Sequence, residues 1–176
     1  MADIYLVSHS ISKRLFWILL VANIIFIFWS QQYLSPLNAR DVVRFEVSKT
    51  MPAAEAIIQG WKDSGKFEKA LQAIYLDYFF IILYTSGLAM ACIFLSNITK
   101  HEILSRAGKI FSFLLIGAGT CDVIENISMT QSVQGHITHL TVALAYDMAM
   151  AKFSVVILSF LFILVCLLFV LLNKIK

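Results

Sequence analysis

Four long apolar runs divide this chain, and they limit what it can fold into. They cover about residues 15–33, 73–97, 107–126 and 137–172. A helix needs ~20 apolar residues to cross the hydrocarbon core of a bilayer, and each run has about that number or more. Charged residues are 14% of the chain, whereas a soluble domain has about 25%. The sequence therefore predicts an all-α integral membrane protein, a four-helix bundle that forms a single domain over residues 1–176.

The connection between the first and second runs, about residues 34–72, is predicted to contain a short amphipathic helix. Thr50 followed by Pro52 is typical of a helix start. The apolar residues that follow fall on one helical face: Ala54, Ile57, Ile58 and Trp61. We expect this helix to lie in the membrane interface or to fold over the mouth of the bundle. The alternative is a linker that is amphipathic without such a role.

The distribution of Lys and Arg predicts the orientation in the membrane. Basic residues precede the first run, lie between the second and third runs and end the chain, whereas the connection between the third and fourth runs has none. Because positively charged loops stay in the cytoplasm, we expect both termini to be cytoplasmic and residues 34–72 to be extracytoplasmic. The latter segment carries six basic residues against five acidic ones, which weakens the contrast. The expected location is the bacterial inner (plasma) membrane, crossed several times.

Ionisable and strongly polar residues gather near the predicted extracytoplasmic ends of the second, third and fourth runs, at one depth when helix rise is counted as ~1.5 Å per residue. Charged side chains cost several kcal/mol near the bilayer core, so they are retained where they pair, bind a ligand or move protons. We therefore predict a ligand-binding or proton-relay site made of Asp77, Tyr84, Asp122, Glu125, Asn126, Asp147 and Lys152. Four of these are carboxylates against a single lysine, an imbalance that calls for protons, a cation or a basic partner.

The third run carries the densest part of this predicted site. Asp122, Glu125 and Asn126 share a helical face. Two small residues, Ala118 and Gly119, lie one turn away on that face, so another helix can approach the acids closely. Two carboxylates three residues apart can share a proton or supply oxygen ligands.

Lys152 is expected to pair with another helix rather than with Asp147. The two residues point ~140° apart on a helical wheel. Asp77 or the carboxylate pair of the third run is the expected partner of Lys152. Tyr84, two turns from Asp77, is expected to satisfy a buried carboxylate or to relay a proton. The alternatives are a polar knot that only fixes helix register and a Lys152 that snorkels to the headgroups.

A divalent metal is a further hypothesis. His136 and His139, together with Asp122 and Glu125, would make a mixed nitrogen and oxygen site suited to zinc. The alternative is that both histidines only begin the fourth helix in water. No other cofactor is predicted, and the sequence has no nucleophile elbow, zinc-protease helix, P-loop or dinucleotide fingerprint to name a catalytic residue.

Three stretches of the chain resemble bacterial four-helix integral membrane proteins to which no established activity is attached. They are FEVSKTMPAAEAIIQGWKDSGKFEKALQAIYLDYFFIILY, GAGTCDVIEN and the AKF around Lys152, which together carry an LDxxF, DxxEN and AKF pattern. The resemblance covers about two thirds of the chain. It implies the four-helix architecture and the choice of polar residues, and it implies no mechanism.

These features favour a function in binding, with translocation as an extension of it. The favoured ligand is a cation or a small cationic or lipid-like molecule, bound near the extracytoplasmic face and coupled to protonation of the acids. The first alternative is a small membrane-embedded lipid-modifying enzyme that uses carboxylates as acid and base or as metal ligands. The second is a non-catalytic assembly or accessory subunit. Membrane lipid is an expected partner and nucleic acid is not, because the net charge of +3 is accounted for by the loops.

Overall fold

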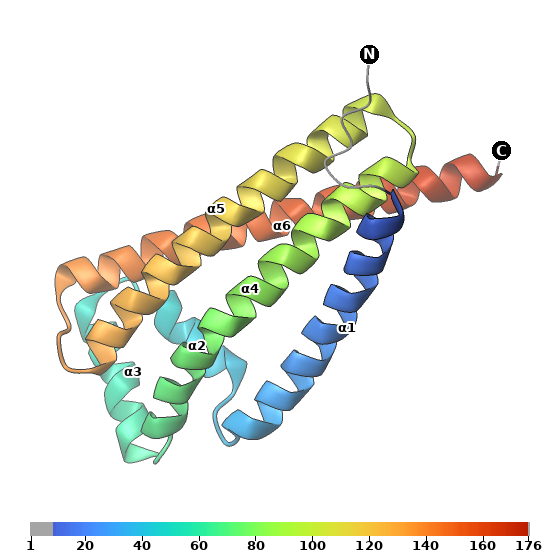
Figure 1. Cartoon of the computed structure of the whole chain (residues 1–176). Coiled ribbons are helices and arrows are strands. Elements are labelled where there is room, and N and C mark those ends of the chain that lie inside the picture. The colour runs from blue at the N-terminus through green and yellow to red at the C-terminus, as the bar shows by residue number, and fades with distance from the viewer. Residues whose placement is uncertain (1–8, 176) are drawn as a thin grey trace.

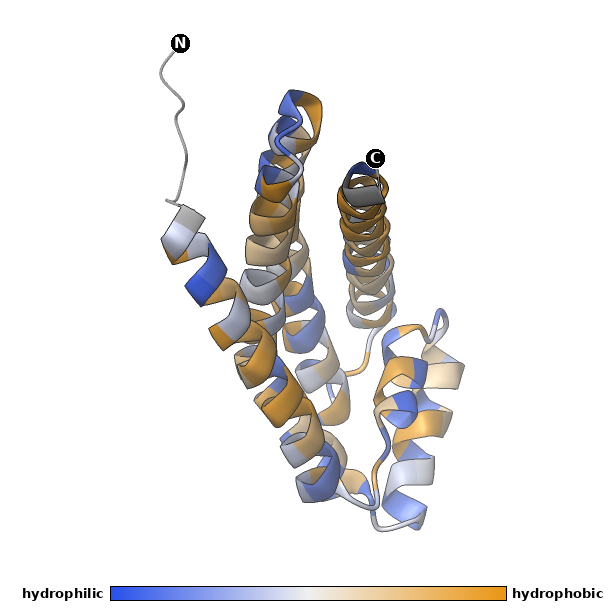
Figure 2. Ribbon diagram, turned by 90° about the vertical axis from the view of Figure 1, so that its right-hand side faces the viewer, coloured by the Kyte–Doolittle hydropathy of each residue, from blue (hydrophilic) through white to orange (hydrophobic). Residues whose placement is uncertain are grey.

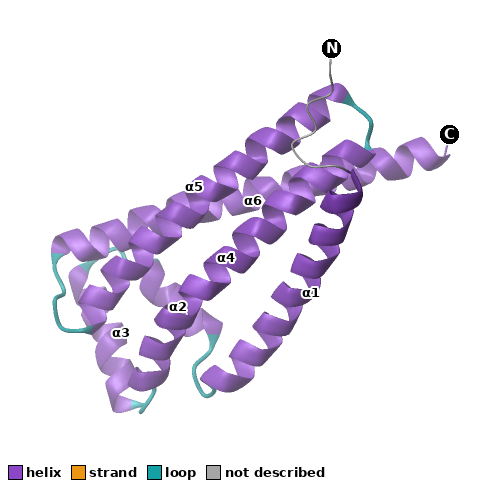
Figure 3. Ribbon diagram, viewed as in Figure 1, coloured by secondary structure: helices purple, strands orange, loops and turns teal. Residues whose placement is uncertain are grey.

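The computed structural model describes residues 9–175, and every element of regular secondary structure in that range is a helix (Figure 3). The six helices are α1 (His9–Leu34), α2 (Ala39–Glu46), α3 (Met51–Asp63), α4 (Phe67–Ile98), α5 (Glu102–Val133) and α6 (His139–Ile175). Four of them, α1, α4, α5 and α6, are long and apolar enough to cross a membrane. The predicted all-α membrane fold is confirmed.

The long helices extend beyond the apolar runs from which they were predicted. α4 begins at Phe67 instead of about residue 73, and α5 runs over Glu102–Val133 instead of about 107–126. Apolar length measures the part of a helix that fits the bilayer, whereas backbone hydrogen bonding continues until a cap or a turn ends it. Asp77 is therefore ten residues inside α4, or about 15 Å from its start at 1.5 Å per residue.

The helices α4, α5 and α6 pack together, and α1 lies on the outer side of α4 (Figure 1). Asn23 of α1 donates a hydrogen bond through Nδ2 to the carbonyl oxygen of Leu83 at 2.9 Å. Phe26 stacks on Phe80 with ring centroids 5.6 Å apart. The remaining faces of α1 expose large apolar side chains, as expected of a helix that contacts lipid.

Two glycines of α5 allow it to approach α4 closely. A Cβ atom added to Gly108 would lie 2.7 Å from the carbonyl oxygen of Cys92, and one added to Gly119 would lie 2.9 Å from Cγ2 of Thr85. Both distances are shorter than carbon atoms tolerate. Small residues at such crossings give close helix packing in membranes.

The helices α2 and α3 form a cap over one end of the bundle, opposite the start of α1 and the end of α6 (Figure 1). We call residues 39–63 the cap. Thr50 is the N-cap of α3, and Ala54, Ile58 and Trp61 form the buried face of this helix. The predicted amphipathic helix and its apolar face are therefore confirmed. Figure 2 shows hydrophilic residues interleaved with apolar ones in the cap, whereas the long helices are mainly apolar.

Two apolar cores lie at different depths of the bundle. The cap core joins the cap to the ends of the long helices, and its buried residues are Leu37, Phe45, Ala54, Ile58, Trp61, Ala70, Ala73, Ile74, Met129, Val133, Val142 and Ala145. The membrane core joins α4, α5 and α6 further along, through the buried residues Cys92, Leu115, Phe162 and Cys166. On α4, α5 and α6, the polar residues predicted as a site lie between these two cores.

Candidate functional site

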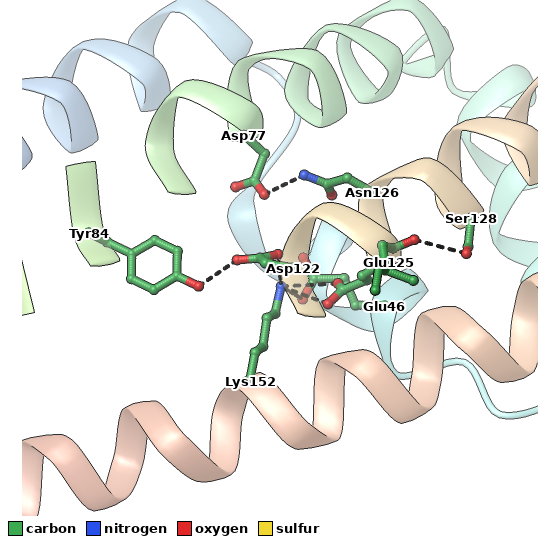
Figure 4. A network of polar contacts seen from close by, with 9 residues as sticks. Glu46, Asp77, Tyr84, Asp122, Glu125, Asn126, Ser128 and Lys152 are labelled. Carbon is green, nitrogen blue, oxygen red and sulfur yellow. Dashed lines mark hydrogen bonds and ion pairs between the residues drawn. The ribbon is translucent and has the colours of Figure 1, made fainter. Parts of the chain in front are cut away.

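Lys152 of α6 is at the centre of a buried group of charges (Figure 4). Its Nζ donates hydrogen bonds to Oδ1 of Asp122 at 2.7 Å and to Oε1 of Glu125 at 3.0 Å. The second oxygen of Glu125 lies 2.9 Å from the same nitrogen. The exposed fractions are 6% for Lys152, 2% for Asp122 and 0% for Glu125, so these charges are removed from both lipid and water. The predicted pairing of Lys152 with the carboxylates of the third run is confirmed, and snorkelling to the headgroups is wrong.

Glu46 of α2 completes this group, and the sequence interpretation missed it. Its Oε2 lies 3.5 Å from Nζ of Lys152, and its side chain is buried. We call Glu46, Asp122, Glu125 and Lys152 the acidic cluster. The signal was weak because Glu46 lies in a segment rich in charges, where a carboxylate usually faces water. The usable hint is its spacing from Val42, four residues earlier, which packs on the cap core.

Burial raises the pKa of Glu46 above its ordinary range, and the positive charge of Lys152 offsets only part of that effect. The negative charge of Asp122 raises the pKa further. Glu46 and Glu125 each place a carboxylate oxygen near the same nitrogen, at 3.5 and 2.9 Å from Nζ of Lys152. Carboxyl groups gathered around one cation can share a proton.

Hydrogen bonds extend the acidic cluster to α4. The Tyr84 hydroxyl donates to Oδ2 of Asp122 at 2.7 Å. Nδ2 of Asn126 donates to Oδ2 of Asp77, also at 2.7 Å (Figure 4). Asp122 therefore accepts from both Lys152 and Tyr84, and Asp77 is attached to the α5 turn that carries the acids. Tyr84, Asp122 and Glu125 thus lie in one network with Lys152, and Asp77 and Asn126 form a separate hydrogen-bonded pair beside it (Figure 4).

Asp147 stands apart from this network. Its side chain is exposed, and the part of the chain that the structure describes offers it no hydrogen-bond or ion-pair partner. The structure therefore does not bring Asp147, although it was predicted as part of the site, together with the other site residues, because it lies on a different face of α6 from Lys152.

The histidines also lie apart from the acids. His136, in the turn between α5 and α6, and His139, at the start of α6, are both exposed. Within residues 9–175, no three His, Cys, Asp or Glu side chains form a group that could hold a metal ion. The predicted set of His136 and His139 with Asp122 and Glu125 is therefore not assembled in this structure.

Two hollows in the described residues lie in the cap surface, and their linings do not include the residues of the acidic cluster. One, of about 530 Å³, lies between α3 and the end of α5, and its lining includes Pro52, Gln59 and Ser132. The other, of about 520 Å³, lies between α2 and α3. Beside it, Lys66 and Asp41 form an ion pair at 3.1 Å, and this hydrogen bond lowers the pKa of Asp41. The acidic cluster itself is enclosed by protein.

Comparisons of this chain with models of protein families, with curated proteins and with solved structures found no match. Its function is therefore inferred from the geometry of the acidic cluster.

Proposed function

We propose that this membrane protein binds protons at the acidic cluster and, in exchange with them, a small cation or cationic headgroup. The observation that supports the proposal is that three carboxylates from two helices converge on one buried ammonium group, at 2.7, 2.9 and 3.5 Å. This excess of negative charge, buried away from water, needs additional positive charge to balance it. Protons are the smallest source of it.

Counting charges shows the size of the imbalance. With all groups ionised, one lysine and three carboxylates sum to a net charge of −2. An uncompensated buried charge costs several kcal/mol. Carboxylates that face one another at short range avoid this cost when one of them takes up a proton. We infer that the folded protein holds at least one proton in the acidic cluster near neutral pH.

The two apolar cores favour exchange with one side of the membrane. The membrane core separates the acidic cluster from the far ends of α4, α5 and α6, and its buried side chains offer a hard cation such as sodium no oxygen ligands. On the other side the cap and the cap core beneath it lie between the acidic cluster and water. Protons and cations are therefore proposed to enter and leave past the cap, which the basic-residue pattern assigns to the extracytoplasmic side. This arrangement favours binding over passage through the protein.

Infrared difference spectroscopy of the purified protein in micelles tests proton binding. Exposed Asp and Glu titrate near pH 4, so a carboxyl carbonyl band that forms between pH ~8 and ~5 reports on buried acids. We expect this band in the wild-type protein and a weaker one in Glu125→Gln, because that variant removes a central acid. Asp147→Asn is the matched control and should leave the band unchanged. A wild-type protein without the band, or a Glu125→Gln variant that keeps it in full, would rule out the proposal.

The same titration tests the cation. Sodium chloride should shift formation of the band to lower pH if sodium competes with protons for the carboxylates. The chloride of N-methylglucamine, at the same concentration, controls for ionic strength. Equal shifts with the two salts would restrict the proposal to protons.

A second candidate function follows from the complete enclosure of the acidic cluster by protein. Lys152, Asp122 and Glu125 all have partners inside the protein, and neither surface hollow reaches them. This is what a polar knot that fixes the register of α5 and α6 requires, as in a non-catalytic assembly or accessory subunit. In such a structural role the carboxyl groups need not change protonation near neutral pH. An infrared spectrum that is constant between pH ~8 and ~5 would therefore favour the structural role.

A further inference from the structure

The cap is attached to the bundle through two adjacent side chains of α2 that differ in chemistry. Phe45 enters the cap core, where its ring meets that of Trp61 edge to face with centroids 5.1 Å apart. Glu46, the next residue, enters the acidic cluster. Of the four members of the acidic cluster, Glu46 is the one that comes from outside the four candidate spans. A change of charge in the cluster therefore acts directly on the cap.

Glu46 meets an excess of negative charge. The ammonium group of Lys152 is already matched by Asp122 and Glu125 of α5, both closer to it than Glu46. Asp77 of α4 adds a further acid whose charge interacts with that of Glu46.

The other charged residues of the cap do not compensate for this. Those of α3, namely Glu55, Lys62 and Asp63, are exposed, and so are the other cap cations, Arg40, Arg44 and Lys49. Asp41, on α2 itself, is paired with Lys66 beside the outer hollow. Lys152 is thus the cation available to Glu46 among the described residues, and it is shared three ways.

We infer that the cap is a pH-dependent lid over the acidic cluster, held closed by protonated Glu46 and loosened when Glu46 ionises. A neutral carboxyl group can remain buried beside Asp122 and Glu125 and share a hydrogen bond with them. An ionised one is repelled by both and is better solvated in water. This inference rests on the proposed proton binding, because it makes Glu46 the group through which protonation acts on access to the acidic cluster.

The direction of the effect follows from linkage. Burial raises the pKa of Glu46 when the cap is closed, so the closed state binds the proton more tightly than the open state. Closure is therefore fully favoured below the ordinary pKa of a glutamate, and that advantage is lost as pH rises through the raised value. Each unit of difference between the two pKa values changes the opening equilibrium about tenfold. The apolar contacts of the cap core oppose opening at every pH.

Amide hydrogen exchange on the full chain in micelles tests the lid. After correction for the intrinsic chemical rate, exchange in residues 39–63 of the wild-type protein should rise about tenfold or more between pH ~5 and ~8, with α5 and α6 remaining protected. Glu46→Gln imitates the protonated side chain and should keep slow exchange across this range. Glu55→Gln, which neutralises an exposed acid of the same cap, should follow the wild type.

The remaining outcomes overturn the inference in distinguishable ways. If exchange in the cap of Glu46→Gln depends on pH as it does in the wild type, a residue other than Glu46 causes that dependence. The infrared band then tests proton binding independently. A variant that fails to fold shows that closure does not depend on a neutral side chain at this position. Faster exchange in α5 and α6 together with the cap means general unfolding and no lid. If the amides of the wild-type cap are equally protected from exchange at both pH values, the cap is not a pH-dependent lid. That conclusion holds even where the infrared band shows proton binding.

Discussion

At the scale of single residues, Lys152 has the largest electrostatic role in this protein. It is the cation around which Asp122, Glu125 and Glu46 are arranged, and all four are buried. Asp147 is on the same helix but exposed, with no partner among the described residues. The two positions therefore form a natural pair of test and control.

Lys152→Met should destabilise the protein much more than Asp147→Asn. Removing one partner of a buried ion pair costs on the order of 3–5 kcal/mol, because the other charges stay buried without compensation. Protonation of the acids relieves part of that cost, so the deficit of Lys152→Met should shrink as pH falls from ~8 to ~5. Thermal unfolding in micelles measures both effects. Equal melting temperatures for Lys152→Met and the wild type at every pH would show that Lys152 contributes no charge compensation.

The residues of the site were predictable to different degrees. Asp77, Asp122, Glu125 and Lys152 were found because a charged residue in an apolar run is unusual and needs a reason. Glu46 lacked that contrast, since its segment is charged throughout. Its burial is a consequence of how α2 lies against α6, and a sequence pattern cannot place a short helix of eight residues in three dimensions.

At the scale of elements, hydrophobic length predicted the four long helices but not where they end. The first turns of α4 and the last turns of α5 continue the helices beyond the apolar runs and reach the cap. α3 was predictable because Thr50, Pro52 and a regular apolar face mark it. α2 carries a weaker pattern: Val42 and Phe45 face the cap core, and Asp41 accepts a hydrogen bond from the Asn38 N–H at 3.3 Å.

The side of the membrane on which the cap lies is an expectation from the distribution of basic residues. A cysteine introduced at Ser64, exposed at the end of α3, tests it. An impermeant thiol reagent should label this variant on intact cells, because the cap is expected to be extracytoplasmic. The wild-type protein is the control, since its Cys92 and Cys166 are buried and Cys121 is partly so. Labelling that requires permeabilised cells would reverse the orientation.

At the scale of the whole molecule, the fold consists of two apolar cores with an acidic layer between them. The membrane core resembles the interior of a helical membrane bundle, with small residues at the close crossings. The cap core packs aromatic and aliphatic side chains of amphipathic helices, as a soluble domain does. The acidic cluster lies where the two meet. Its position explains why opening the cap would expose it and leave the membrane core intact.

The pH dependence of the free energy of unfolding tests most directly whether the folded molecule holds extra protons. Stability falls as pH rises wherever the native state binds more protons than the unfolded state, by about 1.4 kcal/mol per pH unit for each proton. Asp41 does not disturb the measurement, because its lowered pKa affects stability only in acid below its ordinary value of 3.8. We expect the wild-type free energy of unfolding, measured in mixed micelles, to fall between pH ~5 and ~8, and Glu125→Gln to flatten the slope. A free energy that stays constant or rises with pH across that range would contradict proton binding by the acidic cluster.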